Sequence, residues 1–204
     1  GHDLVPPAIG RDGRSYRSEI DDLAAWGQLD TPDGPRRIEG ARGVLGHIHG
    51  RRNRAQAWAW THAVLPGTPE LVFEGLSARL GVAGLTTPPL TSLHLRVDGE
   101  ALSWASPRDL LTARSWLTPG GWSFQTRGPG PQLSGRMTLG TPDQTACVRY
   151  LDERGRPLWC RNNPHSRLEL VLRRPGLPDL RASTDAATGE LATRRAPAQP
   201  TIAP

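Results

Sequence analysis

Lysine is missing from this sequence of 204 residues, and all 25 of its basic residues are arginines. Without a lysine amine the chain cannot form a Schiff base, which excludes pyridoxal-dependent chemistry. The complete replacement of lysine by arginine indicates a codon bias rather than selection for contacts with phosphate. The arginines are also spread along the chain, whereas a nucleic-acid-binding surface concentrates them on one face. We therefore expect no nucleic-acid partner, despite a formal net charge of +5.

Long apolar runs are missing as well, since none approaches the roughly 20 residues that a transmembrane helix needs. The sequence has no charged segment followed by an apolar one, the pattern of a secretory signal, so we expect a soluble, cytoplasmic protein. Long helices are disfavoured because 23 glycines and 20 prolines interrupt the chain roughly every ten residues. That spacing is typical of short strands and predicts an all-β domain.

Cysteine is scarce, with only Cys147 and Cys160 and no Cys-x-x-Cys spacing, which excludes four-thiolate zinc and iron–sulfur sites. In a hairpin turning at 152–155, a four-residue loop puts the two cysteines opposite each other, within reach of a disulfide. A three-residue loop with Gly155 in a bulge makes them diagonal neighbours instead. Because we expect a reducing compartment, we predict two free and partly shielded thiols.

Turn signals divide the rest of the chain into strands. The clearest is Asp98-Gly99, which joins an alternating strand at 92–97 to a second strand at 100–105. Further hairpins are expected around 128–131 and 152–155, and a helical segment at 107–118 starts with an N-cap and a proline. About eight to ten strands result, each beside its sequence neighbour. Up-and-down antiparallel strands close best as a barrel, because closure removes unpaired edges; a two-sheet sandwich is the alternative.

Histidine and tryptophan gather in one strip of the sequence, at residues 45–62. Side chains alternate along a strand, so His47 and His49 share one face, and Trp58, Trp60 and His62 share a face of the next strand. If the two strands pair in the matching register, one surface carries three imidazoles and two indoles. Small residues line the other surface, as they would where something packs closely.

Three interpretations of this strip remain open. The indoles fill the barrel core while the histidines are hydrogen-bonded at its rim. Alternatively, the indoles form the walls of a ligand pocket in which the imidazoles orient the ligand or transfer protons. In the third interpretation, His47, His49 and His62 bind zinc. No acidic residue lies within four residues after His49, so we expect no metal and no cofactor.

These residues also resemble a known family. The segment Gly46-His47-Ile48-His49-Gly50, followed by Trp58-Ala59-Trp60-Thr61-His62, is similar to the lipocalin-like group of tocopherol cyclases, carotenoid 1,2-hydratases (hydroxyneurosporene synthases) and AttH proteins. The segment at 158–163 looks like the closing strands of that group, and the resemblance covers roughly residues 38–173. Two features depart from the family: Ile48 stands where its commonest form has tryptophan, and its members are usually longer, with two barrels.

The resemblance implies an antiparallel up-and-down lipocalin-like β-barrel with part of a second barrel. Residues 1–37 would be an N-terminal extension or the remnant of a first barrel, 38–175 the lipocalin-like barrel, and 176–204 a C-terminal hairpin and flexible tail. The barrel interior would receive a hydrophobic molecule, of the isoprenoid class in the family. The resemblance carries over His47, Trp58, Trp60 and His62 as pocket residues, and His49 shares the face of His47. Exchange of such a ligand would involve transient membrane contact.

We therefore expect a domain that binds a hydrophobic small molecule, with two alternatives. One is an isoprenoid cyclase or hydratase that protonates an alkene, and the other is a structural barrel with a filled core and no ligand. Alkene protonation needs a buried carboxyl group with a raised pKa. Glu74 and Asp109 are candidates only by position, so no catalytic residue is assigned. Enzymatic activity and oligomeric state stay open.

Overall fold

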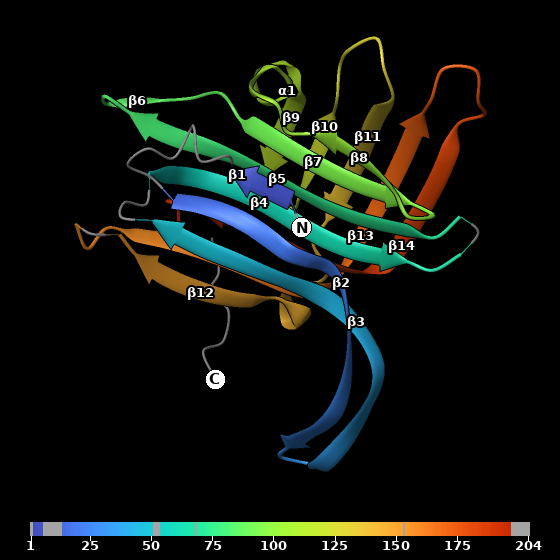
Figure 1. Ribbon diagram of the computed structural model, residues 1–204. Coiled ribbons are helices and arrows are strands. Elements are labelled where there is room, and N and C mark those ends of the chain that lie inside the picture. The colour runs from blue at the N-terminus through green and yellow to red at the C-terminus, as the bar shows by residue number, and fades with distance from the viewer. Residues whose placement is uncertain (1, 6–13, 51–53, 68, 153, 197–204) are drawn as a thin grey trace.

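The computed structural model describes residues 2–5, 14–50, 54–67, 69–152 and 154–196. These residues form almost exclusively antiparallel strands, which confirms the predicted all-β class. They are arranged in two sheets, one of three strands and one of eleven (Figure 1). Within the described ranges, no helix is both long enough and apolar enough to cross a membrane.

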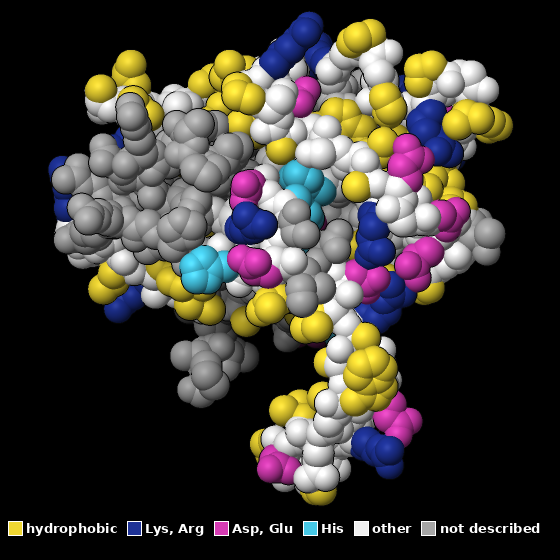
Figure 2. Space-filling view, viewed as in Figure 1, with side chains coloured by type: hydrophobic (Ala, Val, Ile, Leu, Met, Phe, Trp, Pro, Cys, Tyr) yellow, Lys and Arg dark blue, Asp and Glu magenta, His cyan; other side chains and the backbone are white. Residues whose placement is uncertain are grey.

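The smaller sheet has the order β1-β2-β3 and is dominated by a long hairpin. Its strands are β1 (His2–Val5), β2 (Arg14–Thr31) and β3 (Gly34–Gly50). Figure 1 shows this sheet lying across one face of the larger sheet, with the turn of the β2–β3 hairpin extending beyond it. Figure 2 shows hydrophobic side chains on the surface of this extended part. Leu23, Trp26 and Leu29 of β2 are exposed, and Trp26 is 71% accessible.

The larger sheet contains most of the chain. Its strands are β4 (Ala55–Leu65), β5 (Leu71–Val82), β6 (Leu85–Thr86), β7 (Leu90–Val97), β8 (Glu100–Trp104), β9 (Arg114–Thr118), β10 (Gly121–Gln125), β11 (Gln132–Thr138), β12 (Ala146–Leu151), β13 (Pro157–Arg173) and β14 (Leu180–Thr193). One short α-helix, α1 (Pro107–Thr112), and a 3₁₀ turn (Pro142–Gln144) complete the described elements. The predicted hairpins β7–β8, β10–β11 and β12–β13 are confirmed.

The strand order shows why the larger sheet is not a closed barrel. Its main path runs β8-β7-β5-β4-β14-β13-β11-β10-β9, so β4 and β14, its first and last strands in the chain, pair with each other. The expectation of a closed barrel is wrong, because the strand path through the described part of the chain ends at β8 and β9 and does not join them. Among the described residues, no ladder joins β8 to β9, and the sheet stays open there. Strands β8 and β9 have five residues each, and α1 lies in the connection between them.

Side chains bridge the open seam where backbone pairing is missing. Ser77 on β5 and Ser115 on β9 are hydrogen-bonded at 2.9 Å, and the indole Nε1 of Trp104 donates to the carbonyl of Pro131 at 3.0 Å. Helix α1 starts as expected at Ser106, whose hydroxyl accepts from the backbone N–H of Asp109 in a capping box. The helix ends at Thr112, because residues 114–118 continue as β9.

The larger sheet encloses the hydrophobic core on the face that we call the inner face. Ala59, Phe73 and Leu93 lie on this face, and residues from β4 to β14 pack against them. Phe73 stacks on Phe124, with ring centroids 5.4 Å apart, and Trp122 lies 4.6 Å from Phe124. These rings pack against one another in the middle of the interior. We call the opposite side, which faces the smaller sheet, the outer face.

Two expected boundaries can be compared with the described strands. The division at 37/38 falls inside β3, which runs from Gly34 to Gly50 and pairs with β2. The expected C-terminal hairpin is the single strand β14, which lies between β4 and β13 in the larger sheet. The proposed tail at 194–204 lies largely outside the described residues, which end at 196.

The β12–β13 pairing decides the relation of the two cysteines. Leu151 pairs with Pro157, which leaves residues 152–156 in the connection, so neither expected loop length is observed. Cys147 faces Arg161, while Cys160 faces Val148, and side-chain alternation then places the thiols on opposite faces of the sheet. Both thiols are free and Cys160 is buried, in agreement with the prediction.

Candidate functional site

Strand β4 directs the residues of the tryptophan and histidine strip to two different environments. The small residues Ala59, Thr61 and Ala63 are buried on the inner face. Trp58, Trp60 and His62 lie on the outer face, which excludes the interpretation that both indoles fill the main core. Ala59 and Ala63 pack closely within the core, which agrees with the expectation of close packing on the surface lined by small residues.

The expected pairing of β3 with β4 is wrong. Both edges of β4 are already occupied, by β5 on one side and β14 on the other, and β3 pairs with β2 in the smaller sheet. His47 is therefore exposed on a different sheet, opposite Arg17, and does not join the surface of Trp60 and His62. The side chain of His49 lies outside the described residues.

Glu74 on β5 is the centre of the outer face. It lies between His62 of β4 and His94 of β7 in the strand register, and only 1% of it is accessible to solvent. Its carboxylate accepts hydrogen bonds from Trp60 Nε1 at 2.9 Å, from the ring of His2 at 2.9 Å, from the hydroxyl of Tyr16 at 3.2 Å and from Ser18. These donors come from three strands, two of which belong to the smaller sheet.

This arrangement sets the charge of Glu74 and of its neighbour His94. Burial by itself would raise the pKa of Glu74, but donation from His2, Ser18 and Trp60 lowers it below its ordinary value. His94 stacks on His2 with ring centroids 3.8 Å apart, and burial, together with the nearby His2, lowers its pKa to about 3. At neutral pH the outer face therefore holds an ionised carboxylate beside a neutral imidazole.

The geometry around Glu74 suits fastening two sheets together better than donating a proton. A carboxylate with a lowered pKa is a poor acid for protonating an alkene, which needs the opposite shift. The other carboxyl considered, Asp109, accepts from the hydroxyl of Ser106 at 2.6 Å in the capping box of α1. Among the described residues, no group of three or more His, Cys, Asp and Glu side chains has the arrangement to hold a metal ion.

A salt-bridge network also fastens the β2–β3 hairpin to the larger sheet. Asp22 on β2 accepts from Arg42 Nε at 2.7 Å and from Arg96 of β7 at 2.8 Å, while Arg42 also donates to Glu70 at 2.6 Å. Donation from Arg42, with a further contribution from Arg96, lowers the pKa of Asp22 to about 2. The smaller sheet is thus held by ionised groups at two places, around Glu74 and around Asp22.

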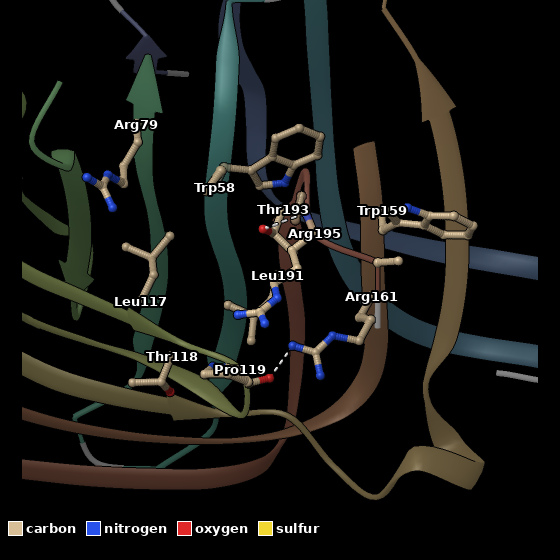
Figure 3. A pocket seen from close by; sticks show the side chains of 13 residues that line it. Trp58, Arg79, Leu117, Thr118, Pro119, Trp159, Arg161, Leu191, Thr193 and Arg195 are labelled. Atoms are coloured by element: carbon tan, nitrogen blue, oxygen red, sulfur yellow. Dashed lines mark hydrogen bonds between the residues drawn. The ribbon is translucent and has the colours of Figure 1, made fainter. Parts of the chain in front are cut away.

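A pocket of about 660 Å³ lies at one end of the larger sheet, beyond the filled part of the interior (Figure 3). It is bounded by β4, β5, β13, β14 and the turn between β9 and β10. The lining residues are Ala57, Trp58, Arg79, Leu117, Thr118, Pro119, Trp159, Arg161, Leu191, Ala192, Thr193, Arg195 and Ala196. Of the site residues expected from the sequence, this set contains Trp58, although its indole Nε1 points to Glu190, at 3.4 Å.

The charged side chains of this pocket are all arginines. Figure 3 shows Arg79 on β5 and Arg161 on β13 at opposite sides of the pocket, with Leu191 between them. Arg161 donates to the carbonyl of Pro119, and Arg79 Nε donates to the carbonyl of Thr87 at 3.3 Å. Neither guanidinium forms an ion pair with a carboxylate of the described residues, and none of the lining residues is acidic.

Comparison with known proteins gives a structural likeness but no match in sequence. No family model matches the chain, and no curated protein matches it. Among solved structures, the crystal structure of a provisionally named AttH protein from Nitrosomonas europaea is similar, with 14% sequence identity and a TM-score of 0.37. The likeness covers 71% of this chain and 53% of that protein. The chain therefore matches about half the length of the AttH protein.

Two groups of residues were not assigned from the sequence. Glu74 has a visible signal, because it is the one charged residue in the otherwise apolar segment 71–76, and such a residue in a buried strand needs partners. Arg79, Arg161 and Arg195 have no such signal. They are distant in the sequence and resemble the many other arginines of this chain, so only the folded sheet brings them to one pocket.

Proposed function

We propose that this chain is a lipocalin-like domain that binds a hydrophobic small molecule in the pocket lined by Trp159. The observation that carries the proposal is a cavity of about 660 Å³ with an indole and aliphatic walls. Ligand sites in proteins are typically concavities of about 300–1,000 Å³ with mostly apolar linings. The strand order supports the lipocalin-like part of the proposal. The first and last strands of the larger sheet pair with each other, which is the arrangement found in up-and-down barrels.

The position of the pocket differs from the one expected for a barrel ligand. The middle of the interior is filled by Phe73, Phe124 and Trp122, so the ligand would occupy the end near the β9–β10 turn. Trp159 lies on the same side of β13 as Arg161, and its ring is 6.0 Å from the guanidinium of Arg149. A flat apolar wall next to cationic groups suits a ligand with an extended or aromatic apolar part.

The proposal does not extend to cyclase or hydratase chemistry. Protonation of an alkene needs a neutral carboxyl group with a raised pKa beside the ligand, and Glu74 has the opposite shift. None of the residues that line the pocket is acidic. Binding alone is the function that the geometry supports best.

Fluorescence titration with a neutral apolar probe, dodecanol, tests the proposal. We expect saturable quenching of tryptophan fluorescence that is reduced in Trp159→Phe, where Trp58 still lines the pocket, and is kept in full in Trp116→Phe. Trp116 is exposed on β9 and does not line the pocket. Calorimetry of Ala57→Phe, which fills the pocket, should show at least tenfold weaker binding. The matched control Ala101→Phe changes an exposed alanine on β8 and should bind normally. Absence of saturable binding of dodecanol and of laurate to the wild type would contradict the proposal.

A further inference from the structure

We infer that the ligand of this pocket has an anionic group, a carboxylate or a phosphate, attached to its apolar part. Arg161 and Arg195 bind that group, and Arg79 adds positive charge from the opposite side of the pocket (Figure 3). This inference rests on the proposed function, because it names the chemical class of the same ligand. The three arginines come from β5, β13 and the segment after β14, and all three line one pocket.

The charge of the pocket has no compensation within the described part of the chain. None of the three arginines forms an ion pair with a described carboxylate, whereas Arg42, Arg96 and other arginines of the sheets each have such a partner. A guanidinium has five N–H donors, and the contacts of Arg79 and Arg161 with backbone carbonyls use only a few of them. Donors of both side chains are therefore left for a ligand.

Arg194 provides a comparison within the same segment. Its guanidinium lies 3.0 Å from the carboxylate of Asp152 and donates to the carbonyls of Arg156 and Ala55, so both terminal nitrogens hold parts of the chain together. The next residue, Arg195, is exposed and its side chain lines the pocket without such a partner among the described residues. Adjacent arginines thus have different surroundings, and only one of them is oriented toward the cavity.

The chemistry of the pocket favours an anion with an apolar body over a free inorganic ion. Guanidinium groups bind carboxylate and phosphate through paired, charge-assisted hydrogen bonds. A cleft lined by one sign of charge concentrates ligands of the opposite sign. The remaining lining residues, Trp159, Leu117 and Leu191 among them, offer apolar contact that an inorganic anion cannot use. A single-chain amphiphile satisfies both parts of the lining.

Binding of three probes with the same alkyl chain to the full chain, below their micelle concentrations, tests the inference. We expect laurate or dodecyl phosphate to bind about tenfold or more tightly than dodecanol, which corresponds to the gain from hydrogen bonds to charged groups. The tighter of the two anions identifies the head group. The preference should decrease as the salt concentration rises.

Variants assign the preference to the arginines. Arg161→Gln should weaken the binding of the anions about tenfold, the exposed Arg79→Gln should weaken it by a smaller factor, and both should leave the binding of dodecanol unchanged. The matched control Arg127→Gln, in the exposed loop between β10 and β11, should bind all three probes normally. If dodecanol binds as tightly as the anions, or if the preference persists in both variants, the inference is wrong while the proposed function stands. If no probe binds, the proposed function itself fails.

Discussion

Phe73 and Glu74 are neighbours in the chain, yet they lie on opposite faces of β5 in opposite environments. On the inner face, Phe73 packs among other rings, and this contact is stabilised by burial without directional bonds. On the outer face, Glu74 is equally inaccessible but is held by hydrogen bonds from the smaller sheet. The comparison shows that one strand supports two kinds of stabilisation. The inner face depends on packed volume, and the outer face depends on hydrogen bonds to charged groups.

The largest expected effect tests the inner face. Phe73→Ala removes a ring that is fully buried and stacked on Phe124. We expect the free energy of unfolding to decrease by about 3–5 kcal/mol, from lost burial and the cavity left behind. Urea denaturation measures it. The control Leu85→Ala, at a residue 77% accessible, should change stability by less than about 0.5 kcal/mol. A loss in Phe73→Ala as small as in the control would contradict a core centred on this ring.

Removal of the charge on the outer face is expected to have a smaller and more local effect. Glu74→Gln keeps the size of the side chain but turns one acceptor oxygen into a donor. That donor would face either the donors of Tyr16 and Trp60 or those of His2 and Ser18. We expect a loss of about 2–3 kcal/mol, the range for hydrogen bonds to charged groups. Hydrogen exchange should increase in β2 before it increases in β13.

The matched control for this variant is Glu100→Gln, because Glu100 is an exposed glutamate at the start of β8. It should leave both stability and exchange unchanged. Uniform loss of protection across both sheets in Glu74→Gln would show that the carboxylate does not act locally on the smaller sheet.

A third prediction tests how tightly the inner face is packed. A Cβ atom at Gly75 would lie 2.9 Å from atoms of Phe73, Leu93 and Trp122. Gly75→Ala should therefore reduce the free energy of unfolding by about 1–3 kcal/mol through overpacking. Gly120→Ala is the control, since no atom lies within 4 Å of its added Cβ. Thermal unfolding of both variants measures the difference. Equal midpoints would mean that the aromatic cluster accommodates the added methyl group without loss of stability.

The last effect, which is the smallest when taken over a single pH unit, concerns protonation of the outer face. Burial lowers the pKa of His94 to about 3, whereas a histidine of the unfolded chain titrates near 6.5. Between these pH values the unfolded chain binds a proton that the folded protein does not. The free energy of unfolding should therefore fall as the pH decreases from about 6.5 toward 3, by at most about 1.4 kcal/mol per pH unit. The pKa of Glu74 is also lowered, so its stabilising contribution is present above the ordinary glutamate value of about 4.3 and is lost only as the pH falls below it.

Denaturation in urea at several pH values between 7 and 5 measures this dependence. His94→Gln should have a flatter profile than the wild type in that range, because the titrating group is gone. His165→Gln, at an exposed histidine of β13, should keep the slope of the wild type. A wild-type slope that persists in His94→Gln would assign the pH dependence to other groups.

Local features of the fold could be predicted from the sequence because short-range interactions decide them. At Asp98-Gly99 both residues have positive φ values, 46° and 87°, as the tight turn of a two-residue hairpin requires. Ser106, Pro107 and Asp109 form the helix start that their spacing indicates. By contrast, the loop of the β12–β13 hairpin is longer than expected, since more than one register satisfies the same turn residues.

Alternation along β4 is the property that the sequence by itself determined. It separated Trp58, Trp60 and His62 from the small residues between them, because successive side chains of any strand point to opposite sides. Which strands pair was decided only by the tertiary structure, where β14 takes the edge of β4 that β3 was expected to occupy. The partners of Glu74 and the arginines of the pocket follow from that choice. His2 is 72 residues from Glu74 in the chain, and only the folding of the whole sheet makes a contact over such a separation favourable.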